Sequence, residues 1–119
     1  MSILIAVAMA ICPAPPAIRL TCLSDGDSIV LNRTRVRLQD IDAPELHGRC
    51  EYETRLAIRA RGRLLALLNE APFTLVTEGK RDRYGRVLAS LRSHGRDLGG
   101  VLVAEGLARK WDGRRRSWC

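Results

Sequence analysis

Long apolar runs are missing from this sequence. Its longest stretch of apolar residues, 3–11, is shorter than the roughly 20 residues that a helix needs to cross a bilayer. Internal repeats, low-complexity blocks and interdomain linkers are also absent. With 119 residues, of which 46% are hydrophobic and 28% are charged, the chain is expected to form one soluble globular domain with its own core.

Lysine is scarce, since Lys80 and Lys110 are the only lysines among 20 basic residues. Arginine therefore carries most of the positive charge. The formal net charge of +7 favours polyanionic partners, because basic side chains gain affinity for phosphates by releasing condensed counterions. The guanidinium suits such partners because it can contact a phosphate through two parallel hydrogen bonds. A GC-rich genome would produce the same arginine bias without any such partner.

The spacing C-x-x-C, which is typical of zinc and redox sites, is also absent. Disulfides are therefore expected rather than a cysteine metal site, with unpaired buried thiols as the alternative. Three complete pairings are possible among the four cysteines, which are Cys12, Cys22, Cys50 and Cys119. The two histidines, His47 and His94, fall in predicted loops without a ligand-spaced partner, so we expect them to be exposed.

The N-terminal segment has the composition of an export signal, although no lysine or arginine precedes its apolar run. Residues 3–11 match the length of a signal-peptide core, and a proline-rich break follows them. We therefore expect residues 1–17 to be a leader and residues 18–119 to be the folded domain. Export would make the protein secreted or periplasmic, with no stable membrane association after cleavage of the leader. A cytoplasmic location is the alternative.

The rest of the sequence alternates between strand and helix patterns. Helices are predicted for residues 51–69, where apolar residues recur every four positions from Leu56 to Leu68, and for residues 97–109, where three glycines weaken the pattern. Turn-like sequences bound five short β-rich runs, at residues 18–23, 28–31, 34–38, 73–77 and 86–91. This order of elements predicts an α+β fold, a five-stranded β-barrel with α-helices of the OB-fold type.

Four short motifs carry the strongest functional signal. In chain order they are DGDSIVL, VRLQDIDAPE, DRYGRVLASL and LVAEGLARKW. They resemble the successive motifs of the staphylococcal nuclease (thermonuclease) family, and the resemblance spans residues 18–111. It implies a five-stranded OB-fold of the staphylococcal nuclease type. The implied activity is a Ca²⁺-dependent phosphodiesterase that hydrolyses DNA and/or RNA with little sequence specificity.

Two carboxylates are candidates for binding the metal. Calcium takes six to eight oxygen ligands, and Asp27 and Asp42 each lie beside a predicted turn from which a carboxylate can converge on a cation. The resemblance adds the backbone carbonyl of Ala43, which stands where the best-known member of the family has threonine. Each carboxylate taken alone is explained equally well by a turn or a loop, so the prediction depends on the motifs occurring together.

The resemblance also assigns catalytic groups. Glu45 matches the glutamate that positions or deprotonates the attacking water. Arg37 and Arg86 match two catalytic arginines, and the chemistry explains their number, because attack on a phosphodiester builds negative charge on the nonbridging oxygens and on the leaving group. Strict alternation along a strand would place Arg37 and Asp42 on opposite faces, so the chain is expected to bend after Leu38.

Three further residues are expected to contact the substrate. Arg83 and Tyr84 resemble family positions that contact a terminal phosphate and nucleotide, and Trp111 falls near a stretch that carries substrate-stacking tyrosines. Stacking on an aromatic ring tolerates any base. Asp40 is expected to be either a surface carboxylate or one that supports the metal ligands without binding the metal itself. The alternatives to a monomeric nuclease are a non-catalytic OB-fold module that binds nucleic acid and an exported, disulfide-stabilised protein that binds another protein.

Overall fold

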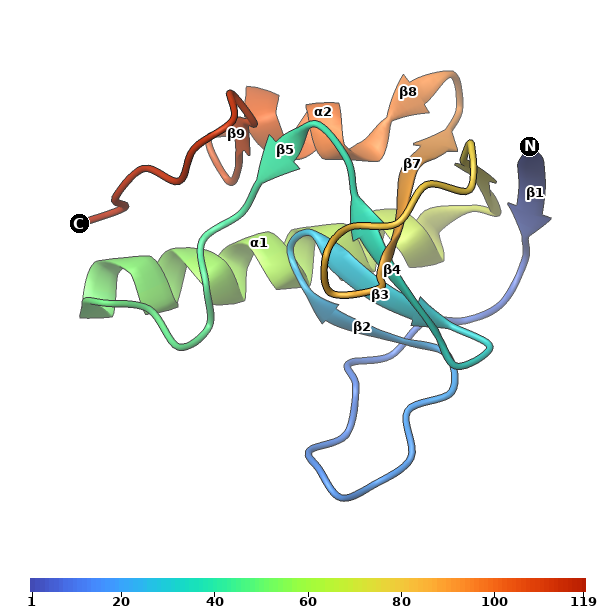
Figure 1. Ribbon diagram of the computed structural model, residues 1–119, viewed down its shortest axis with the longest axis horizontal. Coiled ribbons are helices and arrows are strands. Elements are labelled where there is room, and N and C mark those ends of the chain that lie inside the picture. Colours follow the sequence, from blue (N-terminus) through green and yellow to red (C-terminus); the bar gives the residue numbers. More distant parts are fainter.

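The computed structural model describes residues 1–119 (Figure 1). Along the chain the elements are β1 (Ser2–Ile5), β2 (Cys22–Asp25), β3 (Ser28–Leu31), β4 (Thr34–Leu38), β5 (Ile41–Asp42), α1 (Glu51–Glu70), β6 (Phe73–Val76), β7 (Val87–Ser93), β8 (Arg96–Asp97), α2 (Leu98–Ala104) and β9 (Arg109–Lys110). One mixed sheet has the order β1-β6-β7-β4-β3-β2, with β8 paired to β7, and β5 and β9 form a separate ribbon. The fold is therefore α+β.

The predicted meander of three strands is present as β2, β3 and β4. β3 and β4 pair antiparallel through a tight turn at Asn32 and Arg33, whose φ angles are 47° and 68°. Two successive residues with positive φ give a turn whose twist matches that of the flanking strands, which is why short hairpins favour it. The meander thus forms from local signals in the sequence.

β4 and the segment after it bring the second motif to one place. Val36 and Leu38 are both buried in the core, so Arg37 between them points to the opposite face of the strand. The strand ends at Leu38, and the chain turns at Asp40, where φ is +69°. The expected bend is thereby confirmed, and it carries β5 and Asp42 back towards the face that bears Arg37.

Helix α1 packs its apolar stripe against the sheet and ends at Glu70, one residue beyond the predicted range. The buried apolar residues of the stripe are Leu56, Ala57, Ala60, Leu64, Leu67 and Leu68. The turn between β2 and β3 sits close to this helix because of Gly26, where a Cβ atom would lie 3.0 Å from the Cβ of Ala60 and 3.1 Å from that of Ala43. The helix therefore helps to fix the turn that carries Asp27.

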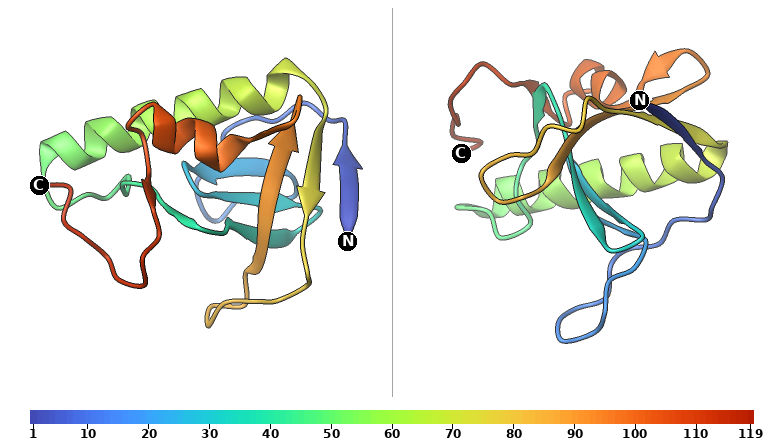
Figure 2. Two further views of the ribbon diagram at one scale, coloured as in Figure 1. Left: turned by 90° about the horizontal axis from the view of Figure 1, so that it is seen from above. Right: turned by 45° about the vertical axis from the view of Figure 1, so that its right-hand side comes forward.

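The expected five-stranded barrel does not close in this structure, because the sheet is open. Four of the five predicted strands are present close to their expected bounds, as β3, β4, β7 and β6, with β4 and β7 paired in parallel. The first, expected at residues 18–23, begins only at Cys22, as β2. Closure would require β6 to pair with the first strand of the meander. Instead the free edge of β6 pairs antiparallel with β1, from Ser2 opposite Val76 to Ile5 opposite Phe73. Figure 2 shows β1 alongside β6 at the edge of the sheet.

The N-terminal segment, expected to be a leader, makes extensive contacts in this structure. Met9 is buried in the core, and its backbone N–H and C=O are both bonded to the side chain of Asn69, at 2.7 and 2.8 Å. A disulfide joins Cys12 to Cys22 at the start of β2. These contacts tie residues 1–17 to the sheet and to α1, and their role as a leader stays a prediction.

The second helix is shorter than the sequence predicts. α2 ends at Ala104, because Gly106 adopts a positive φ of 75° and donates to the carbonyl of Val103, while Leu107 donates to Leu102. A glycine in the left-handed region commonly ends a helix in this way. The chain then continues into β9 instead of extending the helix. Neither helix combines the length and the apolar character needed to cross a membrane.

The basic C-terminal segment is anchored at its far end. The indole of Trp118 packs into the hydrophobic core, and the guanidinium of Arg109 lies 3.7 Å from the centre of its ring. A disulfide joins Cys119 to Cys50, directly before α1, so the C-terminus returns to the start of that helix (Figure 1). With the bridge from Cys12 to Cys22, this leaves no free cysteine and selects one of the three possible pairings.

Candidate functional site

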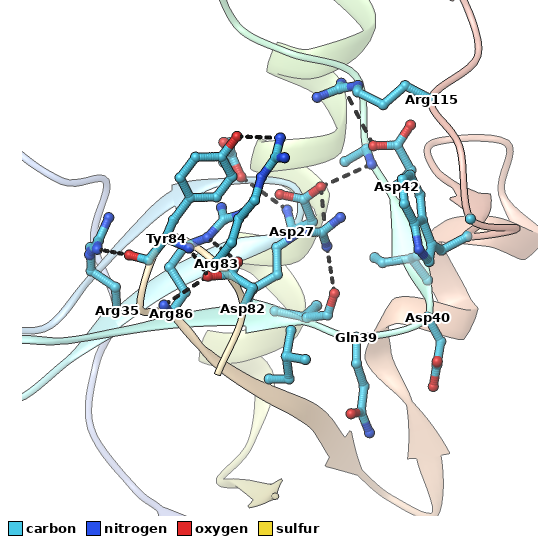
Figure 3. Close-up of a pocket in the computed structure, with 18 of the residues that line it drawn as sticks. Asp27, Arg35, Gln39, Asp40, Asp42, Asp82, Arg83, Tyr84, Arg86 and Arg115 are labelled. Carbon is cyan, nitrogen blue, oxygen red and sulfur yellow. Dashed lines mark hydrogen bonds and ion pairs between the residues drawn. The ribbon is translucent and has the colours of Figure 1, made fainter. Parts of the chain in front are cut away.

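The predicted site residues line one cavity of about 1100 Å³, here called the main cavity (Figure 3). Its walls come from the turn between β2 and β3, the outer face of β4, the segment from β5 to residue 45, the turn before β7 and the C-terminal segment. The predicted residues in its lining are Asp27, Arg37, Asp42, Ala43, Glu45, Arg83, Tyr84, Arg86 and Trp111. The sequence motifs, separate along the chain, thus meet at one hollow.

Asp27 is a buried carboxylate held by its own turn. Its backbone N–H donates to the side chain of Asp25 at 3.1 Å, and its Oδ2 accepts from the backbone N–H of Ala43 at 3.0 Å. The same oxygen lies 3.5 Å from Nη1 of Arg37. Burial and the neighbouring Asp25 raise the pKa of Asp27 to about 7, although Arg37 opposes the rise. Below neutral pH this carboxylate therefore takes up a proton, chiefly because burial removes the water that would stabilise its charge.

Asp42 and Glu45 share one arginine that comes from the far end of the chain. Nη1 of Arg115 lies 2.6 Å from Oε1 of Glu45, and its Nη2 lies 3.7 Å from Oδ1 of Asp42. Burial raises the pKa of Asp42, while Arg115 and Arg37 oppose the rise. Figure 3 shows Arg115 reaching over Asp42 from the C-terminal segment. Arg115 is therefore the cation that compensates these two carboxylates in the structure.

The loop that carries Glu45 is held by a buried carboxylate, Glu53 in the first turn of α1. One oxygen of Glu53 accepts from the backbone N–H of Glu45, and the other accepts from that of Arg49, each at 3.1 Å. Glu53 is only 5% exposed, so these bonds replace the water that the carboxylate loses on burial. Glu53 thus positions the backbone of Glu45 without reaching the cavity itself.

Arg37 and Arg86 approach the cavity from two strands. Arg37 lies on β4 beside Asp27, and it also donates to the carbonyl of Leu38. Arg86 directly precedes β7, and its Nε donates to Oδ2 of Asp82 at 2.8 Å. This bond uses Nε only. The two terminal nitrogens of Arg86 form no hydrogen bond within the protein. Each arginine is thus fixed by a carboxylate while part of its guanidinium stays available to a ligand.

The turn before β7 forms an aromatic and basic corner. The guanidinium of Arg83 lies 5.0 Å from the centre of the Tyr84 ring, that of Arg86 lies 5.6 Å from it, and Arg83 also donates to the Tyr84 hydroxyl at 2.8 Å. Gly85 follows with φ of 80°, a conformation that glycine adopts without strain. Trp111 lines another part of the cavity, and its backbone N–H donates to the carbonyl of Asp40 at 2.9 Å.

Sequence reasoning missed several residues of the site. Arg35 had a usable signal, because it lies two positions before Arg37 on β4 and must share its face. Asp25 and Asp82 also had one, since both lie in turns beside predicted site residues. Arg115 had none, because only the folding of the C-terminal segment brings it to Asp42 and Glu45. The expectation that both histidines are exposed is confirmed, and Asp40 is exposed too.

The acidic residues do not form a ready-made metal cluster. Across residues 1–119 there is no group of three or more His, Cys, Asp or Glu side chains arranged to hold a metal ion. Asp27 and Asp42 nevertheless line the same cavity, and the backbone N–H of Ala43 is bonded directly to Asp27. The acidic groups that could bind a metal ion are therefore the two buried carboxylates of Asp27 and Asp42, which lie next to the backbone at Ala43.

Fold and cavity together define a small α+β domain whose site combines buried carboxylates with arginines, a set suited to an anionic substrate. The family model described as staphylococcal nuclease homologue matches residues 35–117. The chain belongs to this family. It is also 33% identical over 100 residues to the succinoglycan biosynthesis protein ExoI of Rhizobium meliloti (strain 1021), an alignment that covers 80% of the chain. The chain spans about half the length of this relative, 52%.

Proposed function

We propose that the protein is a Ca²⁺-dependent nuclease that hydrolyses phosphodiester bonds of DNA and/or RNA with little sequence specificity. The observation that supports it best is that Asp27, Asp42, Arg37 and Arg86 come from separate segments and line one cavity. Such a set can neutralise a phosphodiester, because carboxylates hold a cation while guanidiniums contact the phosphate oxygens. Membership of the nuclease homologue family gives independent support.

The proposed fold type is an opened OB-fold. When only the five predicted strands are counted, in chain order from 1 to 5, they lie in the sheet in the order 1-2-3-5-4, which is β2-β3-β4-β7-β6. An OB-fold is a five-stranded, partly open barrel that commonly binds oligonucleotides. In this chain the N-terminal strand β1 occupies the edge at which such a barrel would close.

Asp27, Asp42 and the carbonyl of Ala43 are the groups that we expect to hold a divalent cation. Burial raises the pKa of both carboxylates because it removes the water that stabilises their charge, and a bound cation would replace that stabilisation. Hard oxygen donors of this kind fit Ca²⁺, which readily completes its coordination with water. When bound, the cation would stabilise negative charge on a phosphoryl oxygen as a Lewis acid.

The remaining chemistry falls to side chains of the chain itself. Glu45 orients or deprotonates a water whose oxygen attacks phosphorus, and the proton that this water loses passes to solvent. The bond from phosphorus to the 5′ oxygen breaks, and that oxygen takes up a proton from solvent, so the products carry 3′-phosphates and 5′-hydroxyls. Arg37 and Arg86 stabilise the charge that builds on the phosphate oxygens. Arg83 and Tyr84 contact the terminal phosphate and nucleotide, and Trp111 stacks on a base, which requires no particular sequence.

The protein is expected to act as a monomer in an oxidising compartment. Its two disulfides are consistent with an extracellular or periplasmic location, because such bonds persist outside the reducing cytosol. Secretion or transport to the periplasm is part of the proposal, and so is cleavage of the leader; cleavage after residue 17 would remove β1 and Cys12, so the bridge from Cys12 to Cys22 belongs to the uncleaved chain, whereas the bridge from Cys50 to Cys119 would remain.

Digestion of plasmid DNA and of RNA, with Ca²⁺ and then with EDTA, tests the activity. Glu45→Gln should lower the rate about 10²- to 10⁴-fold, the usual contribution of a general base. Arg86→Gln should lower it about 10²- to 10³-fold, as the loss of one donor to a developing oxyanion does. Exposed residues of α1 supply matched controls, Glu51→Gln and Arg59→Gln, which should retain full activity.

Two results would overturn the mechanism: cleavage that persists in EDTA, or full activity in both site variants. Binding of nucleic acid without any cleavage would instead favour the alternative, a non-catalytic module. That alternative keeps the arginines as phosphate ligands but gives Glu45 no role.

A further inference from the structure

A second, smaller hollow of about 380 Å³, here called the outer cavity, opens on the β2-β3-β4 meander. Four arginines line it, and no aspartate or glutamate does. Its complete lining is Arg19, Ser24, Ser28, Ile29, Val30, Arg33, Arg35 and Arg86. Convergence of four guanidiniums without a carboxylate in the lining creates a strongly positive concave surface, which favours an anion.

Three of the four arginines have no acidic partner anywhere in the protein. Arg19 donates to the carbonyl of Pro13 at 3.0 Å, Arg35 donates to the carbonyl of Tyr84, and neither they nor Arg33 form an ion pair. Arg86 alone is paired, with Asp82. Their charge is thus uncompensated, whereas Arg37, Arg86 and Arg115 in the main cavity each pair with a carboxylate. An arginine guanidinium offers five donors, so each retains donors for a ligand.

The outer cavity borders the main cavity. Arg35 and Arg86 line both. On β4, Arg35 and Arg37 share one face two residues apart, which is about 6.6 Å along a strand, and Arg33 lies in the turn just beyond. The three arginines therefore lead from the main cavity towards the tip of the hairpin. Figure 3 shows Arg35 at one side of the main cavity, where its guanidinium donates to the backbone carbonyl of Tyr84.

We propose that the outer cavity binds backbone phosphates of the same single-stranded polynucleotide whose scissile linkage lies in the main cavity. The inference rests on the proposed function for the identity of the polymer, but it concerns binding and not cleavage. A polyanion that enters the main cavity and continues past Arg35 meets Arg33 and Arg19 next. An isolated small anion would not explain why two arginines are shared between the hollows. Long substrates should therefore bind more tightly than short ones.

Binding measured in EDTA tests this without cleavage. Fluorescence anisotropy follows a labelled single strand of about 12 nucleotides, within the size range that OB-folds bind, and calorimetry follows an unlabelled dinucleotide that reaches only the main cavity. The variant is Arg19→Gln with Arg33→Gln, two residues outside the proposed catalytic machinery. The matched control is Arg59→Gln with Arg96→Gln, which removes two other exposed arginines that form no ion pair.

In the test variant, the slope of log affinity against log salt should fall by about 1.4, since each phosphate contact of a single strand contributes about 0.7. Between about 50 and 200 mM salt, the advantage of the unmodified protein over this variant should then shrink about sevenfold. Affinity for the dinucleotide should not change, and the control should keep the original slope.

The inference is overturned if test and control variants bind the long strand equally, if the dinucleotide loses as much affinity as the long strand, or if the unmodified protein binds no strand. Equal binding of poly-glutamate of matched charge would also overturn it, in favour of an acidic protein segment. Digestion of the same strand in Ca²⁺ separates the two proposals. Binding with the predicted slope but no cleavage would contradict the proposed nuclease activity and support the proposed binding at the outer cavity. Cleavage without any effect of the variant on binding would support the nuclease activity and contradict binding at the outer cavity.

Discussion

At the scale of single residues, the ionisation of Asp27 makes the free energy of unfolding depend on pH. In the unfolded chain its pKa is near 3.8, and in the folded protein it is about 7. Between these two pH values the folded protein keeps a proton that the unfolded chain has lost. Its free energy of unfolding therefore falls as the pH rises from about 4 to about 7 and does not change further through this group above pH 7.

Asp27→Asn should remove this pH dependence. Without divalent cations at about pH 8, the variant should unfold with a free energy higher by on the order of 2–4 kcal/mol, because one unit of pKa shift corresponds to about 1.4 kcal/mol. Urea unfolding in EDTA at several pH values measures the difference, and Asp40→Asn is a suitable control because Asp40 is exposed. A variant that is less stable than the unmodified protein at pH 8 would contradict the assignment.

We expect Arg115 to compete with the proposed divalent cation for Asp42, which is one of the expected ligands of that cation. Its guanidinium is about half exposed, and its contacts with Asp42 and Glu45 are worth about 1 kcal/mol or less at such a surface. Arg115→Gln should therefore raise the affinity for Ca²⁺ about two- to fivefold, whereas Arg115→Lys should stay close to the unmodified protein. Calorimetric titration with Ca²⁺ alone measures this, and Arg114→Gln is the neighbouring control. Weaker Ca²⁺ binding by Arg115→Gln would contradict the competition.

At the scale of elements, the segment between β5 and α1 has no regular structure and depends on Glu53. Two backbone N–H groups converge on this carboxylate, and an amide side chain cannot accept from both as well, because one of its two terminal atoms is a donor.

Glu53→Gln should therefore lower the free energy of unfolding by about 1–3 kcal/mol, the cost of leaving a buried polar group unpaired. The segment around Glu45 should also exchange its amide hydrogens faster. Urea unfolding and hydrogen exchange measure the two effects. Glu51→Gln, in the same helical turn but exposed, should change stability by no more than about 0.5 kcal/mol. Equal effects of the two substitutions would show that Glu53 does not hold the loop.

At the scale of the whole molecule, the two disulfides restrain the chain to different extents. Cys50 and Cys119 are separated by 69 residues, and Cys12 and Cys22 by 10. Closing the longer loop removes more entropy from the unfolded chain. The long bridge also fixes the C-terminal segment, which carries Arg115.

Replacing both cysteines of the long bridge by serine should cost about 4 kcal/mol, and replacing both of the short bridge about 3 kcal/mol, on the loop-entropy estimate. Guanidinium chloride unfolding measures both pairs. Loss of the long bridge should in addition raise Ca²⁺ affinity as Arg115→Gln does, because it releases the segment that holds Arg115. A larger loss of stability from the short bridge would contradict this account.

Local sequence signals determined the individual elements of this protein. The Asn32 turn, the apolar stripe of α1 and the alternation along β4 each depend on neighbouring residues, so they were predictable. The motifs also marked the residues that line the main cavity, because each motif is a short contiguous segment. Even the bend at Asp40 followed from requiring Arg37 and Asp42 to share a face.

Only the tertiary structure decided features that join distant parts of the chain. β1 pairs with the free edge of β6, so that edge cannot pair with β2 and the sheet stays open. The unpaired backbone N–H and C=O groups of an edge strand can pair with any strand that comes within reach. Gly106 ends α2, and the chain beyond it, which is bridged to Cys50 at Cys119, places Arg115 over Asp42. No local pattern encodes such contacts, since each depends on where two remote segments meet after folding.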